Sequence, residues 1–464
     1  MVWWTKCQIE EYPPKGDVYM KDVLVSLAEK IKENACRKGF DEAAVLAVRN
    51  NEVMIKIANS QPSVIQHWSN IVINLYLVKN KRIFVTSYTL KNPDEVLKAI
   101  DDILNVSESV EQSEYYAPLP EPSRIDFLKG ITDKRVIDAL KNPEKVVDKL
   151  FSALSSIKVD ETAGVLTLEY EGKALATSTG VSLYEEATGF NIYIRAFKDE
   201  GSGQWGMSSS KLDLKLIEET VNRATEYAVE SRRPEPLEPG VYDIILSPMV
   251  AGNLLSLIGF MASAMAIDMG FSIFMGKKLG EKVASDKLTL IDDPRLEDAY
   301  NSASFDDEGV PTYTKPIIEK GILKNILHNT KTAKKHGTKS TGNAGWIMPE
   351  PWNLVVQAGD LKEDELIGEV KRGLLVTNNW YTRLQNYIDG TFSTILRDAI
   401  FLIENGRIVK ATSKLRIADK LPRLLSNIVA LGKESYQAKW WEIDKPVITP
   451  FILVRNVHTS KHTL

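Results

Sequence analysis

Hydrophobic residues near the start of the chain recur at the spacing of one helical face and predict a helix: Met20, Val23, Leu24, Leu27, Ile31 and Ala35. Four apolar runs with strand character follow, at residues 43–49, 52–58, 71–78 and 82–88. The pair Asn50-Asn51 predicts a turn between the first two runs, and Asn92-Pro93 opens a second helix. This order predicts an α+β layer, in which helices cover one face of an antiparallel sheet.

Three prolines and a glycine interrupt the helical and strand periodicities over residues 231–240. Before this segment, the pattern predicts further helices and strands at residues 146–154, 163–170, 191–197 and 214–231. After it, an apolar helix begins at Ser247-Pro248, and most remaining runs are short strands joined by glycine turns. We therefore predict an N-terminal α+β domain (1–234) and a C-terminal β-rich domain (235–464).

The composition narrows the functional classes. The 464 residues carry a net charge of −4 without a basic block, which argues against direct contact with nucleic acid. Cys7 and Cys36 form neither a disulfide framework nor a metal knuckle. The first 19 residues lack the apolar stretch of a signal peptide, and the apolar tract Leu254–Ala266 is too short to span a bilayer. These features predict a cytoplasmic protein that does not enter a membrane.

Several short motifs suggest chemistry but lack the context that it requires. Gly201 to Gly206 have the glycine spacing of a dinucleotide loop, but a serine run follows in place of a helix. We therefore predict a mobile glycine turn. His328 and His336 flank a lysine-rich segment with no acidic residue nearby in sequence, which predicts ordinary surface histidines.

Two polar segments are candidates for binding. Asp306, Asp307 and Glu308 can bind a cation, cap backbone amides or orient a substrate amine, and the prediction for them is a solvated acidic turn. Residues 340–344 offer hydroxyl and amide donors to a peptide backbone. The sequence contains no Gly-x-Ser-x-Gly elbow, so residue chemistry alone predicts no catalytic residue in this chain.

Seven stretches, taken together and in this order, resemble the TldD/PmbA family of metallopeptidase subunits, also called modulators of DNA gyrase: Gly276–Ala284, Ile291–Pro294, Phe305–Thr312, Ile318–Leu323, Ser340–Asn343, Arg372–Val376 and Gly390–Ser393. The resemblance covers nearly the whole chain, weakly before Pro234 and strongly after it. It implies an α+β N-terminal domain and a β-rich C-terminal domain, which pair with a homologous subunit around an enclosed cavity.

The resemblance also bears on the metal. The catalytic TldD-type subunit carries His-Glu-x-x-x-His on a helix near the start of its second domain. The matching positions here are Ser256, Leu257 and Met261, and the C-terminal cysteine that resembles a third ligand is absent after Cys36. The resemblance therefore implies a TldE/PmbA-like chain with no metal, cofactor or catalytic residue of its own, and zinc in a TldD-like partner.

The implied function is that of a subunit in a heteromeric zinc peptidase that acts on unfolded or short peptides, because a folded domain cannot enter an enclosed cavity. This chain alone is predicted to be inactive and to shape the peptide-binding cavity. The predicted substrate-binding residues are Ser340, Thr341, Gly342, Asn343, Thr391 and Ser393.

Two alternatives remain open. In the first, the chain is a non-catalytic peptide-binding or assembly factor, which can also be a homodimer. The sequence does not separate this role from that of a peptidase subunit, because a chain without metal ligands looks the same in both. In the second, the chain is itself an enzyme with its metal at a different place, where His328 or His336 joins Asp306 or Glu308 in a new site. The gyrase link in the family name gains no support from the acidic charge balance.

Overall fold

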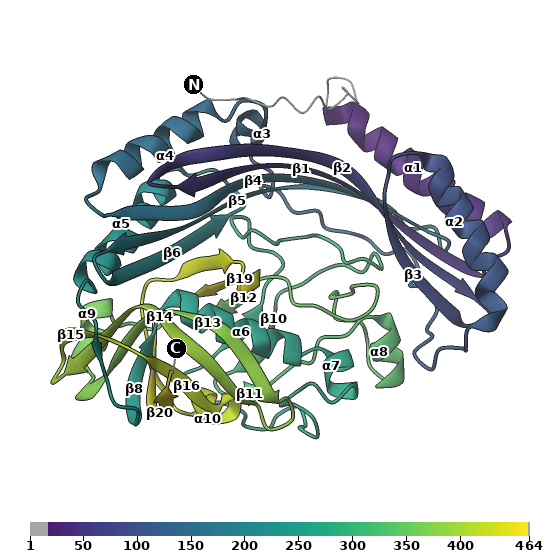
Figure 1. The fold of residues 1–464 in the computed structure, drawn as a ribbon. Coiled ribbons are helices and arrows are strands. Elements are labelled where there is room, and N and C mark those ends of the chain that lie inside the picture. The colour runs from purple at the N-terminus through teal and green to yellow at the C-terminus, as the bar shows by residue number, and fades with distance from the viewer. Residues whose placement is uncertain (1–16, 463–464) are drawn as a thin grey trace.

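The computed structural model describes residues 17–462 and has two layers (Figure 1). A long curved sheet with helices on its outer side forms an arch over a β-rich body built from the C-terminal half of the chain. Helix accounts for 25% and strand for 42%, so the predicted α+β class is confirmed. Cys7 and most of the segment predicted to contain no signal peptide lie outside the described residues.

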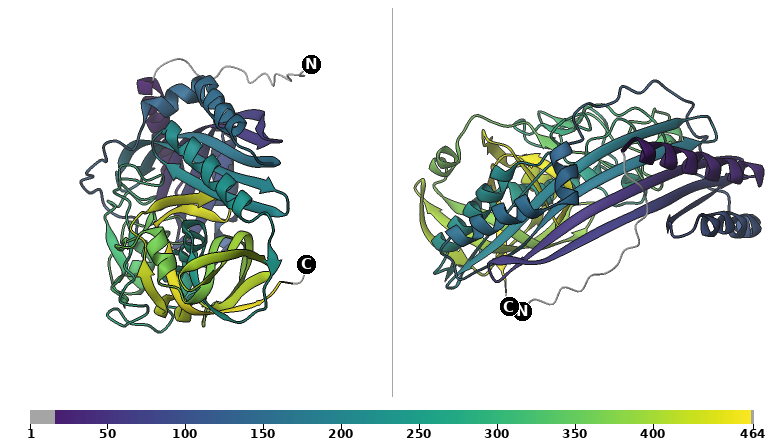
Figure 2. Two further views of the ribbon diagram at one scale, coloured as in Figure 1. Left: turned by 90° about the vertical axis from the view of Figure 1, so that its left-hand side faces the viewer. Right: turned by 90° about the horizontal axis from the view of Figure 1, so that it is seen from above.

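Six of the described strands form the arch in the order β3-β2-β1-β4-β5-β6, and each neighbouring pair is antiparallel. Their bounds are β1 (Glu42–Ala58), β2 (Gln61–Lys79), β3 (Arg82–Thr89), β4 (Glu161–Thr177), β5 (Ser182–Lys198) and β6 (Gly201–Ser209). Most of these strands are far longer than the usual five or six residues. Their length gives the sheet room to twist and curve over the body beneath it (Figures 1 and 2).

The predicted turn at Asn50-Asn51 is wrong. Strand β1 runs straight through both residues, because each is paired on two sides. Asn50 lies opposite Asn70 of β2 and Glu171 of β4, so the ladders continue without interruption. Asparagine favours turns when its side chain can bond to the local backbone, and here two neighbouring strands take its backbone groups instead.

Helices cover the convex face of the arch in two groups (Figure 2). At one end lie α1 (Asp17–Arg37) and α2 (Pro93–Val106), and at the other α3 (Lys134–Lys141), α4 (Glu144–Ser156) and α5 (Leu214–Glu230). The predicted stripe on the first helix packs on the sheet, with Leu24 and Ile31 buried against Ile73 and Leu75. The Asn92 side chain accepts a hydrogen bond from the Asp94 amide and fixes the start of α2, as its sequence predicts.

The glycine segment 201–206 is a strand, so the predicted mobile turn is wrong. It begins β6, which packs closely against α5. A Cβ atom at Gly203 would lie 2.2 Å from the Ala224 carbonyl oxygen and 2.6 Å from the Tyr227 Cβ. Glycine is therefore required here because the backbones of the strand and the helix approach closely, not because the chain must turn.

The C-terminal half is β-rich, as predicted. Five of the described strands close into a barrel in the order β13-β8-β20-β16-β14, because β14 also pairs with β13. These are β8 (Val241–Leu246), β13 (Arg372–Asn386), β14 (Thr391–Glu404), β16 (Leu415–Lys420) and β20 (Ile452–Lys461). The strands β15 (Arg407–Ser413), β7 (Glu235–Pro236) and β17 (Ile428–Leu431) extend it. Closure removes exposed strand edges from the barrel.

A second C-terminal sheet has the order β11-β10-β9-β12-β19-β18. Its bounds are β9 (Leu290–Asp292), β10 (Lys315–Glu319), β11 (Ile322–Leu323), β12 (Leu354–Val356), β18 (Tyr436–Trp440) and β19 (Ile443–Thr449). The helices of this half are α6 (Pro248–Met261), α7 (Ala264–Asp268), α8 (Thr330–Lys335), α9 (Glu363–Gly368) and α10 (Leu421–Ser426). No helix among the described residues is both long and apolar enough to cross a membrane.

Apolar and polar contacts join the arch to the barrel. Trp205 of β6 is 3% exposed and stacks on Phe451 at 6.3 Å between ring centroids. Asp398 of β14 has a fully buried side chain that accepts hydrogen bonds from Arg195 Nε at 2.6 Å and Ser202 Oγ at 2.8 Å. One hydrophobic core therefore runs through both halves. The division between residues 234 and 235 stays a prediction.

We expect Gly203→Ala to lower the free energy of unfolding by about 1–3 kcal/mol, because the added methyl group must push β6 away from α5. Urea unfolding measures the change. Gly368→Ala is the matched control, because a Cβ atom there meets nothing within 4 Å. A Gly203→Ala variant as stable as this control would contradict the close packing of β6 on α5.

Candidate functional site

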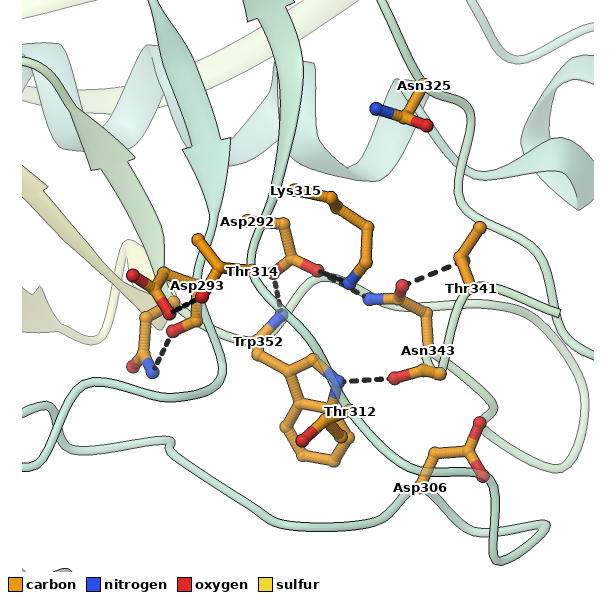
Figure 3. A network of polar contacts seen from close by, with 12 residues as sticks. Asp292, Asp293, Asp306, Thr312, Thr314, Lys315, Asn325, Thr341, Asn343 and Trp352 are labelled. Carbon is orange, nitrogen blue, oxygen red and sulfur yellow. Dashed lines mark hydrogen bonds and ion pairs between the residues drawn. The ribbon is translucent and has the colours of Figure 1, made fainter. Parts of the chain in front are cut away.

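A buried carboxylate organises the loops beside the second C-terminal sheet (Figure 3). Asp292, the last residue of β9, is 0% exposed and accepts a hydrogen bond from Lys315 Nζ at 3.0 Å. The two residues are direct partners in the β9–β10 ladder, which explains why their side chains meet. The Trp352 amide and Asn343 Nδ2 each donate to the same carboxylate at 2.7 Å. The paired charges are thus neutralised and hydrogen-bonded within the protein.

The predicted donors at residues 340–343 are tied into this network. Thr341 Oγ1 donates to Asn343 Oδ1 at 2.8 Å, and Asn343 Nδ2 also donates to the Glu350 carbonyl at 2.8 Å. Trp352 Nε1 donates to the Gly342 carbonyl at 2.8 Å (Figure 3). Ser340 Oγ donates to the His328 carbonyl at 3.3 Å. These contacts hold the loop rigid, and a substrate role for its residues stays a prediction.

Gly342 shows why this loop needs its glycine. Its φ angle is +68°, and a Cβ atom would lie 2.5 Å from the Pro311 carbonyl oxygen. A side chain would therefore be strained by the backbone conformation and would also collide with the neighbouring loop. The glycine lets the loop pass close to Pro311 and keeps Asn343 in reach of Asp292.

The predicted solvated acidic turn is wrong for two of its three residues. Asp306 is 1% exposed and Glu308 is 2% exposed, whereas Asp307 is partly buried. Asp306 accepts hydrogen bonds from the amides of Glu308, Val310 and Ala344. Of the three roles considered from the sequence, the capping of backbone amides is the one that this geometry supports.

Charge and burial also determine how readily the carboxylates of the acidic turn take up protons. Glu308 accepts a hydrogen bond from the Thr330 amide at 2.9 Å and lies 3.4 Å from the buried Lys331 Nζ. Burial, followed by the nearby Glu308 carboxylate, raises the pKa of Asp306 well above its ordinary value. Burial also raises the pKa of Asp307 to about 6, against the opposing effect of Lys173. The turn therefore takes up protons more readily than an exposed acidic loop.

His328 lies against the loop of residues 340–343, and His336 lies beside it. His328 is buried and is not the surface histidine predicted, because the segments 328–332 and 340–343 fold over it. Its ring lies 5.4 Å from that of His336, whose Nε2 contacts Asp268 Oδ1 at 2.9 Å. The structure thus groups these histidines with Asp268. The alternative metal site with Asp306 or Glu308 stays a prediction. Within residues 17–462, no group of three or more histidine, cysteine or acidic residues could hold a metal ion.

Thr391 and Ser393 lie apart from the loop of residues 340–343, on β14 of the barrel. Strand β14 is paired on both sides here, with Ser393 opposite Arg383 of β13 and Ala418 of β16. Ser393 Oγ accepts a hydrogen bond from Gln385 Nε2 at 2.9 Å. Neither edge of β14 is therefore free for a peptide strand at Ser393. A role for Thr391 and Ser393 in substrate binding stays a prediction.

The zinc-motif positions lie on α6, which is buried on most sides between β12, β19 and the barrel. Ser256 Oγ donates to the Asn253 carbonyl at 2.7 Å, Leu257 is partly buried, and Met261 is fully buried. A hydroxyl, an isobutyl group and a thioether do not replace the imidazole and carboxylate groups that zinc prefers. The side chains at these positions do not suit zinc.

Asn253 is the polar centre of α6, and the sequence analysis missed it. Its Oδ1 accepts hydrogen bonds from Asn379 Nδ2 at 2.8 Å and Thr382 Oγ1 at 2.7 Å. Its Nδ2 donates to the Glu442 carbonyl at 2.8 Å. The sequence does contain a sign of this network, the pair Asn378-Asn379 in an otherwise apolar part of β13. Buried amides need hydrogen-bond partners, so this pair predicts a polar residue nearby.

A small cavity of about 110 Å³ lies between the concave face of the arch and the loop that carries Tyr300. Its wall is acidic, with Glu169, Glu171 and Glu185 among the lining residues. Lys173 lies 3.5 Å from Glu185 and packs 4.8 Å from the centre of the Phe305 ring. The lysine therefore offsets part of the negative charge of the cavity wall.

The ion pair at the centre of the site gives a stability prediction. We expect Asp292→Asn to lower the free energy of unfolding by about 3–5 kcal/mol, because Lys315 would remain buried without its carboxylate. The double variant Asp292→Asn/Lys315→Met removes both charges and should recover part of the loss in urea unfolding. A double variant less stable than either single variant would contradict the pairing.

The buried histidine gives a pH prediction. Burial, followed by the nearby His336, lowers the pKa of His328 from 6.5 to about 4. The unfolded state therefore binds the proton first, and the contribution of neutral His328 to stability, complete above pH 6.5, is lost as the pH falls to about 4. The loss is on the order of 2–3 kcal/mol. Asp307 opposes it, because its raised pKa favours folding as the pH falls below about 6.

We expect His328→Gln to flatten the fall in unfolding free energy between pH 6.5 and pH 4, relative to the unchanged chain. The matched control is His67→Gln, since His67 is exposed on β2. Equal pH dependence in the unchanged chain and both variants would show that His328 does not contribute as described.

Comparison with known proteins identifies two domains of one family. Residues 115–232 match the PmbA/TldA metallopeptidase central domain, and residues 239–461 match the C-terminal domain of the same family. A metalloprotease of Methanothermobacter thermautotrophicus is 29% identical over 312 residues, which cover 64% of this chain and 68% of that protein. The metalloprotease PmbA of Escherichia coli O157:H7 is 32% identical over 202 residues, 43% of each chain.

Relatives named PmbA and relatives named TldD are both among the matches. A solved structure of TldE from Thermococcus kodakarensis has the same fold, with a TM-score of 0.81 over 94% of this chain and 100% of that chain, at 24% identity. The family resemblance found in the sequence is therefore confirmed. This chain belongs to the PmbA/TldD family of metallopeptidases.

Proposed function

We propose that this chain is the TldE/PmbA-like, non-metal-binding subunit of a heteromeric zinc peptidase that acts on unfolded or short peptides. A TldD-like homologous subunit carries the zinc in this proposal, and the bound zinc activates water and polarises the peptide carbonyl there. This chain completes the cavity and positions the substrate. By itself it has no peptidase activity.

The observation that carries the proposal is the chemistry of α6. The positions that match the zinc motif are Ser256, Leu257 and Met261. The Ser256 hydroxyl donates its hydrogen bond to a backbone carbonyl of the same helix. One turn earlier, Asn253 binds strand β13 and the turn after β18 through its side-chain amide. These contacts support a structural role for the helix, since each donor and acceptor is used to hold neighbouring segments together.

The names of the relatives support a TldD-like partner. Its members include metalloproteases named PmbA and others named TldD, which supports a pairing of two homologous chains that differ in their metal ligands. The other features predicted from the sequence agree with this role: no direct contact with nucleic acid and a cytoplasmic location. Both stay predictions.

The rigid loops described above support the positioning role. The carboxylate of Asp292 and the amide of Asn343 fix the loops of residues 340–352 in one conformation. A fixed loop can present backbone groups to an extended peptide without losing conformational entropy on binding. The selectivity proposed here is steric, because an enclosed cavity admits unfolded or short chains and excludes folded domains.

The test is peptide hydrolysis by a TldD-like homologue that carries the His-Glu-x-x-x-His motif, with and without an equimolar amount of this chain. We expect turnover of a labelled unstructured peptide only when both chains are present, since the cavity is completed by both. Heat-denatured samples of this chain serve as the control for carrier effects.

Equal turnover in the presence and absence of this chain would contradict the proposal. That result would favour the second role considered from the sequence, a separate peptide-binding or assembly factor. Turnover by this chain alone, abolished by a zinc chelator, would contradict the absence of a metal site.

A further inference from the structure

Three aromatic side chains form an exposed patch beside α6. Trp380 is 36% exposed, Tyr381 48% and Trp441 62%. The ring centroid of Trp380 lies 6.1 Å from that of Tyr381 and 6.2 Å from that of Trp441. We name these three residues the aromatic platform. Large exposed aromatic groups are unfavourable in water, so a contiguous set of them indicates a surface that binds something.

The backbone beneath the platform is strained and irregular. Tyr381 has a φ angle of +58°, which bulky residues rarely adopt. The β13–β14 register shifts between Trp380 and Arg383, so the platform lies at a bulge. The Tyr381 amide donates to Glu442 Oε1 at 3.2 Å, which holds the unusual conformation. Bulges and strained residues of this kind are concentrated at functional sites, where they direct a side chain outward.

The platform is also held in place from behind. Asn253 of α6 accepts a hydrogen bond from Thr382, the neighbour of Tyr381, and donates one to Glu442, the neighbour of Trp441. A single buried amide therefore joins the two segments that carry the aromatic rings. A surface fixed in this way binds with a small loss of conformational entropy.

Two guanidinium groups pack on the rings. The Arg383 guanidinium lies 3.9 Å from the centre of the Tyr381 ring, and that of Arg397 lies 5.0 Å from the centre of the Trp380 ring. Such cation–π contacts orient the rings. Guanidinium groups also have several donors, so they can bind carbonyl or carboxylate oxygens of a molecule that lies across the platform.

The spacing of the rings points to an extended peptide. Alternate side chains on one face of an extended chain are about 6.6 Å apart, close to the ring spacings of the platform. We propose that the aromatic platform binds an extended peptide that carries large apolar or aromatic side chains at positions i and i+2. The inference deepens the proposed function, on which it rests, by assigning a second peptide contact to the subunit that lacks the metal motif.

The platform is too small to be a stable interface with another copy of the chain. An aromatic side chain offers roughly 150–250 Å², so the exposed fractions given above leave about 300 Å² in total. A stable protein interface needs about 800 Å² from each partner. A patch of this size suits one short segment of peptide.

The test uses this chain alone, without a partner and without hydrolysis. The probe is a fluorescein-labelled ten-residue peptide of serine and glycine with phenylalanine at two positions separated by one residue. Fluorescence anisotropy measures its binding. We expect Trp441→Ala to weaken binding about tenfold or more, as for an aromatic anchor at a binding surface, and Trp441→Phe to retain most of it.

Two controls make the test specific. Phe151→Ala removes an aromatic residue that is 53% exposed on α4, on the outer side of the arch, and should leave binding unchanged. A peptide of the same composition with adjacent phenylalanines should bind more weakly, because its side chains point to opposite sides. Equal binding by Trp441→Ala and the unchanged chain, or equal binding of both peptides, would overturn the proposal.

The remaining outcomes separate this inference from the proposed function. A chain that binds the probe through Trp441 but never supports hydrolysis by a TldD-like homologue would overturn the proposed function and leave the platform in place. A chain that supports hydrolysis while Trp441→Ala binds the probe normally would overturn the platform alone. Sedimentation that shows a dimer of the unchanged chain, lost in Trp441→Ala, would also overturn it, because the platform would then be an interface between copies.

Discussion

The side of the C-terminal half that carries the predicted peptide-binding loop depends on one buried ion pair. A carboxylate removed from water must be neutralised and hydrogen-bonded, or the loss of hydration is too costly. Asp292 meets this need through Lys315, Asn343 and the Trp352 amide. Hydrogen bonds to this one carboxylate therefore fix β9, β10 and the loops of residues 340–352 relative to one another.

A second polar centre in this half acts in the same way. The Asn253 amide joins α6 to β13 and to the turn after β18, and it sits one helical turn from Ser256. In the proposal, α6 corresponds to the helix that carries the metal site in the catalytic subunit. In this chain it supports the aromatic platform instead.

The sequence predicted what depends on local pattern. The stripe from Met20 to Ala35, the cap at Asn92 and the β-rich C-terminal half all follow from spacing and composition, and the structure bears them out. The predictions that were wrong concern residues whose conformation or burial depends on segments distant in sequence. Two neighbouring strands hold Asn50-Asn51 extended, and a facing helix explains the glycine at 203. The burial of Asp306 and the grouping of Trp380 with Trp441 depend on tertiary contacts that no local pattern contains.

We propose above that this chain contributes binding surface to the peptidase and holds no metal ion. Native mass spectrometry of this chain mixed with a TldD-like homologue measures it most directly, because the mass gives both the number of chains and the number of zinc ions. We expect a complex with one copy of each chain and one zinc ion, and no zinc ion when the His-Glu-x-x-x-His motif of the homologue is mutated. A zinc ion that remains bound to this chain, or two zinc ions in the complex, would contradict it.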